Sequence, residues 1–221
     1  MPDNSSLPRG RYRAFLFDMD GTIISSIASA ERIWGAWALR HGLDVESFLP
    51  TIHGARSVDT VARLKLPGVD AEVEARAITE AEIEDVEGIV EITGAIQFLN
   101  SLPADQWAIV TSAPKALAIR RLQAAGVTVP AVLVTAEDVA IGKPHPDGYL
   151  LAARKLGVAA ADCLVFEDAV VGIAAGVAAG ATLLVVTATH GHVVDTPHAS
   201  ISGYETVRVV EDGDGWLRLQ Q

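Results

Sequence analysis

Short runs of consecutive apolar residues recur along the chain, separated by segments of helix length in which apolar and polar positions alternate with helical spacing. Each run is apolar at consecutive positions, which is typical of strands buried on both faces of a parallel sheet. The alternation of such strands with helices predicts an α/β fold with a parallel sheet. The five predicted strands are residues 14–17, 107–110, 131–134, 163–166 and 183–186.

The first two predicted strands are separated by roughly ninety residues, far more than a single crossover helix needs. Within this gap, residues 23–41 have helical spacing and residues 71–91 are strongly acidic. We therefore predict an all-helical cap domain inserted at residues 24–92. The two flanking segments, residues 1–23 and 93–221, would together form the sheet domain.

Both ends of the chain differ from this alternation. Residues 1–13 are polar and lack the apolar core of a secretory signal, so we expect a loose lead-in. Near the other end, residues 207–210 and 216–220 alternate in polarity around EDGDG and predict a β-hairpin. The sequence from Asp212 to Gly215 lacks the remaining oxygen ligands of a calcium loop, which favours a turn.

Residues 169–189 carry no charge and are long enough to span a bilayer. The segment divides at Gly180 into a Gly- and Ala-rich half and a β-branched half. We interpret it as a helix, a turn and a buried strand. Glycines at 172 and 176 would let the helix pack closely on the sheet.

The composition narrows the classes of partner. The 221 residues carry a formal net charge of −11, without a concentrated basic patch, which argues against a nucleic-acid or anionic-membrane partner. The single cysteine, Cys163, lies in an apolar run and is interpreted as a small buried hydrophobe. A reducing, cytoplasmic location fits this cysteine usage.

Polar side chains follow four of the five predicted strands. They are Asp18 and Asp20, Thr111 and Ser112, Lys143, and Glu167 and Asp168. The carboxyl ends of parallel strands share one edge of a sheet, where ligands bind, so these side chains should converge. Several carboxylates in one crevice repel each other unless a cation shares them, and hard oxygen ligands favour Mg²⁺ over zinc. Lysine and hydroxyl donors beside them suit a phosphoryl group.

Four motifs carry a family resemblance over nearly the whole chain. DMDGT, TSAP, the lysine of GKPHPDGY and FEDAVVGIAAGVAAG occur in this order. They resemble the motifs of haloacid dehalogenase superfamily phosphatases that have a helical cap inserted after the first motif. The resemblance implies a Rossmann-like core. It also implies that Asp18 is the nucleophile and that Asp20 is first the general acid and then the general base.

The same resemblance implies how the remaining site residues act. Mg²⁺ would be held by Asp18, the backbone carbonyl of Asp20, and Asp168, with Glu167 close by through water. The transferring phosphoryl group would be bound by Thr111, Lys143 and Ser112.

Within the superfamily, the first motif and the linker favour a phosphatase. Dehalogenases lack the second aspartate, here Asp20, and mutase relatives carry a histidine soon after the first motif, whereas no histidine precedes His41 in this chain. Ser25 and Ser26 stand where many capped relatives have an aspartate. This pattern is most similar to phosphatases acting on glycerol 3-phosphate, 2-deoxyglucose 6-phosphate and related sugar or polyol phosphates.

The predicted cap contains two groups of residues with open roles. In TIHGARSVDTV, the residues His53, Gly54 and Arg56 either bend over the site and meet substrate or form a helix entry with an exposed arginine. Trp34 and Trp37 have the spacing of an amphipathic helix, so we expect them in the cap core rather than stacking on a sugar.

His190 and His192 could form a transition-metal pair, but without further ligands a solvated loop near the site is favoured. We therefore predict a Mg²⁺-dependent phosphoric monoester hydrolase that acts on small sugar or polyol phosphates and is a monomer or weak homodimer. Two alternatives stay open: a mutase resembling β-phosphoglucomutase, and a non-catalytic phosphate-binding regulatory protein.

Overall fold

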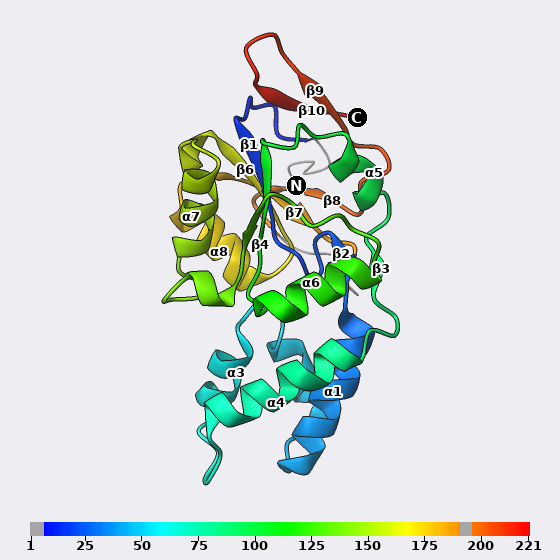
Figure 1. Cartoon of the computed structure of the whole chain (residues 1–221), viewed down its shortest axis with the longest axis vertical. Helices are drawn as coiled ribbons and strands as arrows, with labels where there is room; N and C mark the ends of the chain where they lie inside the picture. Colours follow the sequence, from blue (N-terminus) through cyan, green and yellow to red (C-terminus); the bar gives the residue numbers. More distant parts are fainter. Residues whose placement is uncertain (1–6, 191–195) are drawn as a thin grey trace.

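The computed structural model describes residues 7–190 and 196–221 and consists of a sheet with flanking helices above a helical part (Figure 1). The sheet has the order β5-β4-β1-β6-β7-β8, and every pair of neighbours is parallel. All five predicted strands are present, which confirms the α/β fold. The strands are β1 (Ala14–Phe17), β4 (Trp107–Val110), β5 (Val132–Val134), β6 (Cys163–Glu167), β7 (Thr182–Val186) and β8 (Ala199–Ile201).

Helices cover both faces of this sheet, as the consecutive apolar residues of its strands require. Phe15 and Phe17 of β1 pack on the side of α5 (Ala95–Asn100) and α6 (Lys115–Ala124). Alternate residues of β1 turn to the opposite side, where they pack against residues of α7 (Asp147–Lys155) and α8 (Val170–Ala178). Cys163 is free and buried, as predicted.

The helical part lies between two short strands, β2 (Ile24–Ser25) and β3 (Val90–Glu91), which pair antiparallel. Trp34 and Trp37 are buried in its core with Phe48, which confirms their predicted place. The inserted helical cap of the predicted fold is therefore present, while its domain boundaries stay a prediction. The helices are α1 (Ile27–Arg40), α2 (Val45–Phe48), α3 (Ser57–Leu64) and α4 (Ala71–Glu84), with a 3₁₀ turn, η1, at Leu49–Thr51.

The uncharged segment 169–189 folds as predicted, into α8, a turn and β7. Gly180 has a φ of +78°, a left-handed conformation that suits glycine. Within residues 7–190 and 196–221, no helix combines the length and apolar composition needed to cross a membrane.

The chain ends in the predicted hairpin, formed by β9 (Arg208–Glu211) and β10 (Leu217–Gln220). The prediction of a loose lead-in is wrong for residues 11–13. Tyr12 is buried and pairs with Leu217, and the Arg13 guanidinium lies 4.2 Å from the centre of the Trp216 ring. Tyr12 lies between two arginines, so the sequence has no apolar run at this position from which the contact could be predicted.

Candidate active site

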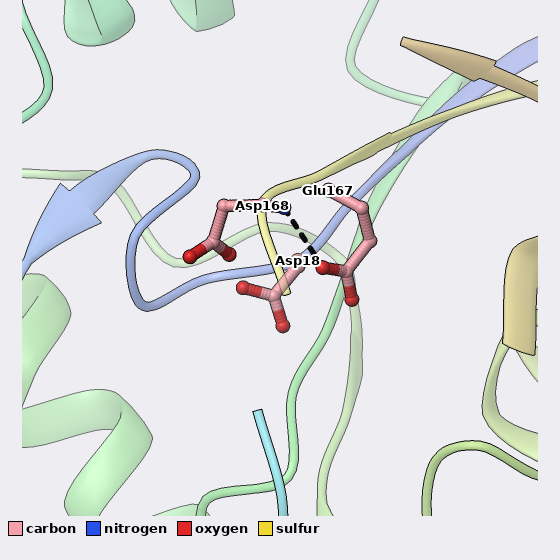
Figure 2. Close-up of side chains that lie close together, drawn as sticks. All are labelled: Asp18, Glu167 and Asp168. Atoms are coloured by element: carbon pink, nitrogen blue, oxygen red, sulfur yellow. Dashed lines mark hydrogen bonds between the residues drawn. The ribbon is translucent and has the colours of Figure 1, made fainter. Parts of the chain in front are cut away.

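Three carboxylates lie together at the carboxyl edge of the sheet. Asp18 follows β1, Glu167 ends β6, and Asp168 follows it. β1 and β6 are parallel neighbours in which Phe17 is opposite Phe166, so the residues that come next are also side by side. The three side chains lie close together (Figure 2). One oxygen from each carboxylate lies within 4.8 Å of the other two, and all three residues are buried.

Lys143 supplies a positive charge to this cluster. Its Nζ lies 2.5 Å from Asp18 Oδ1 and 2.7 Å from Glu167 Oε1, and it also donates to the Val110 carbonyl. Burial alone would lower the pKa of Lys143, but the two carboxylates outweigh burial and raise the pKa. The lysine is therefore positively charged. Lys143, Asp18 and Glu167, which were predicted to converge at this edge of the sheet, lie in contact.

The Glu167 carboxylate is fully engaged within the protein. Oε1 accepts from Lys143 and from the Tyr149 hydroxyl at 2.9 Å, and Oε2 accepts from the backbone N–H groups of Asp168 and Ala169. Glu167 thus orients the lysine and the start of the loop that carries Asp168. Tyr149 was not predicted as a site residue, because the sequence pattern of an amphipathic helix indicates only that such a tyrosine packs in the core.

The cluster fits a divalent cation. Burial and the neighbouring carboxylates raise the pKa of Asp18 to about 8 against the opposing effect of Lys143, and they raise the pKa of Asp168 as well. Three buried carboxylates beside one ammonium group leave negative charge without compensation, which a dication would balance. Carboxylate oxygens are the ligands that Mg²⁺ prefers. Asp168 is oriented by Thr22, whose hydroxyl donates to its Oδ1 at 3.1 Å.

Asp20 lies apart from the three-carboxylate cluster and has different partners. Its Oδ1 accepts from Ser26 Oγ at 2.6 Å and from an Arg121 amino group at 3.0 Å. The second amino group of Arg121 donates to Glu82 of α4 at 2.9 Å. Arg121 and Glu82 were missed by the sequence reasoning. Each could have been found as a charged residue on the buried face of a helix, because residues four apart lie on the same face. Arg121 follows Leu117 by four residues, and Glu82 follows Ile78 by four.

Thr111 and Ser112 follow β4, and both lie at the same edge. Thr111 Oγ1 accepts from the Ala113 N–H at 3.1 Å, which orients the hydroxyl without using its hydrogen. Ser112 Oγ donates instead to the Gly54 carbonyl at 2.8 Å and so joins the sheet part to the cap.

A cavity of about 1020 Å³ lies between this edge and the cap. Its wall includes Asp18, Asp20 and Asp168 from the sheet side. The cap contributes apolar and acidic side chains, among them Trp34, Leu49, Ile52, Glu31, Glu46 and Glu82. The cavity is therefore large enough for a small polar ester whose phosphate end lies at the carboxylates.

The predicted cap residues divide between two places. His53 and Gly54 line the large cavity, where desolvation lowers the pKa of His53. Arg56 does not line it, since its guanidinium binds Asp59 and the Ala140 carbonyl. His190 lines the cavity, with its Nε2 3.1 Å from the Asp168 carbonyl oxygen. His192, the other residue of the metal pair that was considered and not favoured, lies outside the described residues.

Comparison with known proteins agrees with this arrangement. The haloacid dehalogenase-like hydrolase family model matches residues 12–180. Hexitol phosphatase A of Escherichia coli K12 is 37% identical over 95% of this chain and 100% of its own length. Glycerol-1-phosphate phosphohydrolase 2 of Saccharomyces cerevisiae is 33% identical over 81% of this chain and 76% of its own.

Solved structures share the fold. A hydrolase from Pseudomonas syringae superposes with a TM-score of 0.73 at 26% identity, covering 82% of this chain and 87% of that one. A hydrolase of the same family from Deinococcus radiodurans, with bound phosphate and sodium, has a TM-score of 0.62 at 30% identity, covering 86% and 90%. The chain therefore belongs to the haloacid dehalogenase-like hydrolases and is a phosphoric monoester hydrolase.

Proposed function

We propose that this protein is a Mg²⁺-dependent phosphatase that hydrolyses small sugar or polyol phosphates through an aspartyl-phosphate at Asp18. The observation that carries the proposal is the position of Asp18, which lies beside Lys143 and Asp168 at the wall of the large cavity. A phosphate placed there meets a nucleophile, a fixed ammonium group and a cation site together.

In the first step, a carboxylate oxygen of Asp18 attacks phosphorus, and the ester P–O bond breaks. The electron pair of that bond passes to the leaving oxygen, which takes a proton from the Asp20 carboxyl group. Lys143 offsets the negative charge of the phosphoryl oxygens, and the Thr111 hydroxyl is placed to donate to one of them.

In the second step, water attacks phosphorus and gives a proton to Asp20. The bond between phosphorus and the Asp18 oxygen breaks, its electron pair restores the Asp18 carboxylate, and phosphate is released. Asp18 and Asp168 would hold Mg²⁺, which when bound supplies further positive charge to the phosphoryl oxygens. Glu167 would act by holding Lys143 and the loop of Asp168, since both of its oxygens are already engaged.

The proposed substrate class rests on the cavity and on the relatives. The curated relatives include a hexitol phosphatase, glycerol-1-phosphate phosphohydrolases and 2-deoxyglucose-6-phosphate phosphatases. The cap wall contains acidic side chains, including Glu31 and Glu46. Their carboxylates can accept hydrogen bonds from the hydroxyl groups of a sugar or polyol, and their negative charge would repel a second phosphate. This observation favours a monophosphate hydrolase over a mutase, whose bisphosphate intermediate carries two phosphates.

A panel of phosphate esters tests the proposal. Hexitol, hexose and glycerol phosphates, with a hexose bisphosphate as comparison, are incubated with the protein in Mg²⁺ and in chelator, and released phosphate is measured. We expect release from monophosphates only with Mg²⁺, and loss by at least ~10³-fold in Asp18→Asn, because the nucleophile is removed. Isomerised sugar phosphate without released phosphate would identify a mutase, and no turnover of any ester would favour a phosphate-binding protein.

A further inference from the structure

The side chain of Asp20 is held from one side only. Ser26 and Arg121 both donate to Oδ1, whereas none of the hydrogen bonds among residues 7–190 and 196–221 goes to Oδ2. The side chain is 27% exposed and lines the large cavity. Two donors on one oxygen fix the plane of the carboxyl group and leave the other oxygen available to carry a proton.

Arg121 is itself fixed by the cap. Its side chain is 7% exposed and that of Glu82 is 4% exposed, so the ion pair between α6 and α4 is almost dry. One guanidinium group thus binds two carboxylates, one from the sheet part and one from the cap. Arginine suits this role because its amino groups have a rigid planar arrangement, which a lysine does not reproduce.

We propose that Arg121 is a positioning residue that holds Asp20 for proton transfer to the leaving oxygen, and that Glu82 anchors Arg121 from the cap. This inference rests on the proposed function, in which Asp20 protonates the leaving group. Because Glu82 belongs to α4, the position of Asp20 depends on the cap being seated against α6.

The leaving group provides the test, since a good leaving group needs no proton and a poor one does. The kcat/KM is measured for 2,4-dinitrophenyl, 4-nitrophenyl and phenyl phosphate, which have similar shapes and increasingly basic leaving groups. This ratio reports only the steps up to release of the phenol, so the later attack of water does not affect it. Arg121→Met should lower kcat/KM by about 30-fold or more for phenyl phosphate and by less than about 3-fold for the dinitrophenyl ester.

Three further variants keep the test interpretable. Arg121→Lys should fall between the wild type and Arg121→Met, because an ammonium group restores charge without the planar contact. Glu82→Gln should shift the leaving-group dependence in the same direction by a smaller amount. Arg120→Met is the matched control, since Arg120 neighbours Arg121 on α6 but is more exposed, and its leaving-group dependence should equal that of the wild type.

The outcomes separate this inference from the proposed function. An equal loss of kcat/KM for all three esters in Arg121→Met, or no loss for any, would overturn the positioning role. If Arg121→Met does not fold, the same criterion applies to Arg121→Lys and Glu82→Gln. If the wild-type protein cleaves neither these aryl esters nor the sugar and polyol phosphates of the panel above, the proposed function fails instead.

Discussion

At the scale of single residues, the environment of Glu167 shows how closely the backbone approaches the site. A Cβ built on Gly172 of α8 would overlap the Glu167 carboxylate. Both oxygens of that carboxylate accept hydrogen bonds, so the side chain can move aside only by breaking them. The glycine is therefore needed to let the helix pass over a carboxylate that already holds Lys143 and Tyr149.

Substitution of that glycine should damage activity beyond its cost in stability. Gly172→Ala forces Glu167 to move, so Lys143 loses its orientation, and we expect kcat to fall by about 10²-fold. The matched control is Gly176→Ala on the same helix, where the added methyl group meets the far end of Leu183. That variant should cost about 1–3 kcal/mol of unfolding free energy and keep most of its kcat. Equal kcat values for the two variants would contradict this account of Glu167.

Cys163 gives a second prediction at this scale. Burial raises the pKa of its thiol to about 12, and the residue is inaccessible in β6. A raised pKa keeps the thiol neutral below that pH, and the thiolate is the reactive form. The native protein should therefore react with a thiol reagent at pH 8 only as fast as it unfolds, and fully in denaturant. Rapid labelling of native protein would show that the strand is not buried.

At the scale of elements, the cap meets the sheet part through the loop at Gly54. The φ of Gly54 is +76°, its carbonyl accepts from Ser112, and a Cβ there would press on Ala169 and Val171. Gly68, in another cap loop, also has a φ of +76° but nothing within 4 Å of its Cβ position. The two glycines share a left-handed backbone conformation, which strains any residue with a side chain, and they differ in what such a side chain would contact.

This pair separates backbone strain from cap seating. Gly54→Ala should lower kcat/KM by about 10-fold or more, because the cap can no longer close on the site. Gly68→Ala should cost about 1–2 kcal/mol of unfolding free energy from the left-handed backbone and leave kcat/KM nearly unchanged. Steady-state kinetics and urea unfolding of both variants provide the measurement, and an equal loss of kcat/KM would argue against a contact role for Gly54.

The same scale shows what sequence could and could not predict. Four of the five predicted strands, β1, β4, β6 and β7, were predictable because both of their faces are buried, which leaves an uninterrupted apolar run. β5 keeps an apolar run although it lies at a sheet edge and is only partly buried. β8 was not predicted because its three residues are only partly buried at the sheet edge. β2 and β3 were not predicted because each has only two residues, too few to show an alternation of apolar and polar positions. Strand ends revealed the carboxylate cluster, whereas the link from Arg121 to Glu82 joins two helices whose packing no local pattern encodes.

At the scale of the whole molecule, a formal net charge of −11 and a buried carboxylate cluster both predict a response to divalent cations. Mg²⁺ that binds only the folded protein should stabilise it by about 2.7 kcal/mol at a concentration one hundred times its Kd. Asp168→Asn should abolish this gain in thermal unfolding, whereas Asp105→Asn, an exposed control, should keep it. Equal gains in both variants would indicate nonspecific screening of surface charge.

The central claim is that the carboxylate of Asp18 takes up the phosphoryl group. Borohydride added during turnover reduces an aspartyl-phosphate to homoserine, which peptide mass spectrometry locates in the sequence. The account predicts homoserine at position 18 in wild-type protein turning over a hexitol phosphate with Mg²⁺, and none in Asp18→Asn or without substrate. Sustained release of phosphate with no modification at position 18, or with modification at another carboxylate, would contradict it.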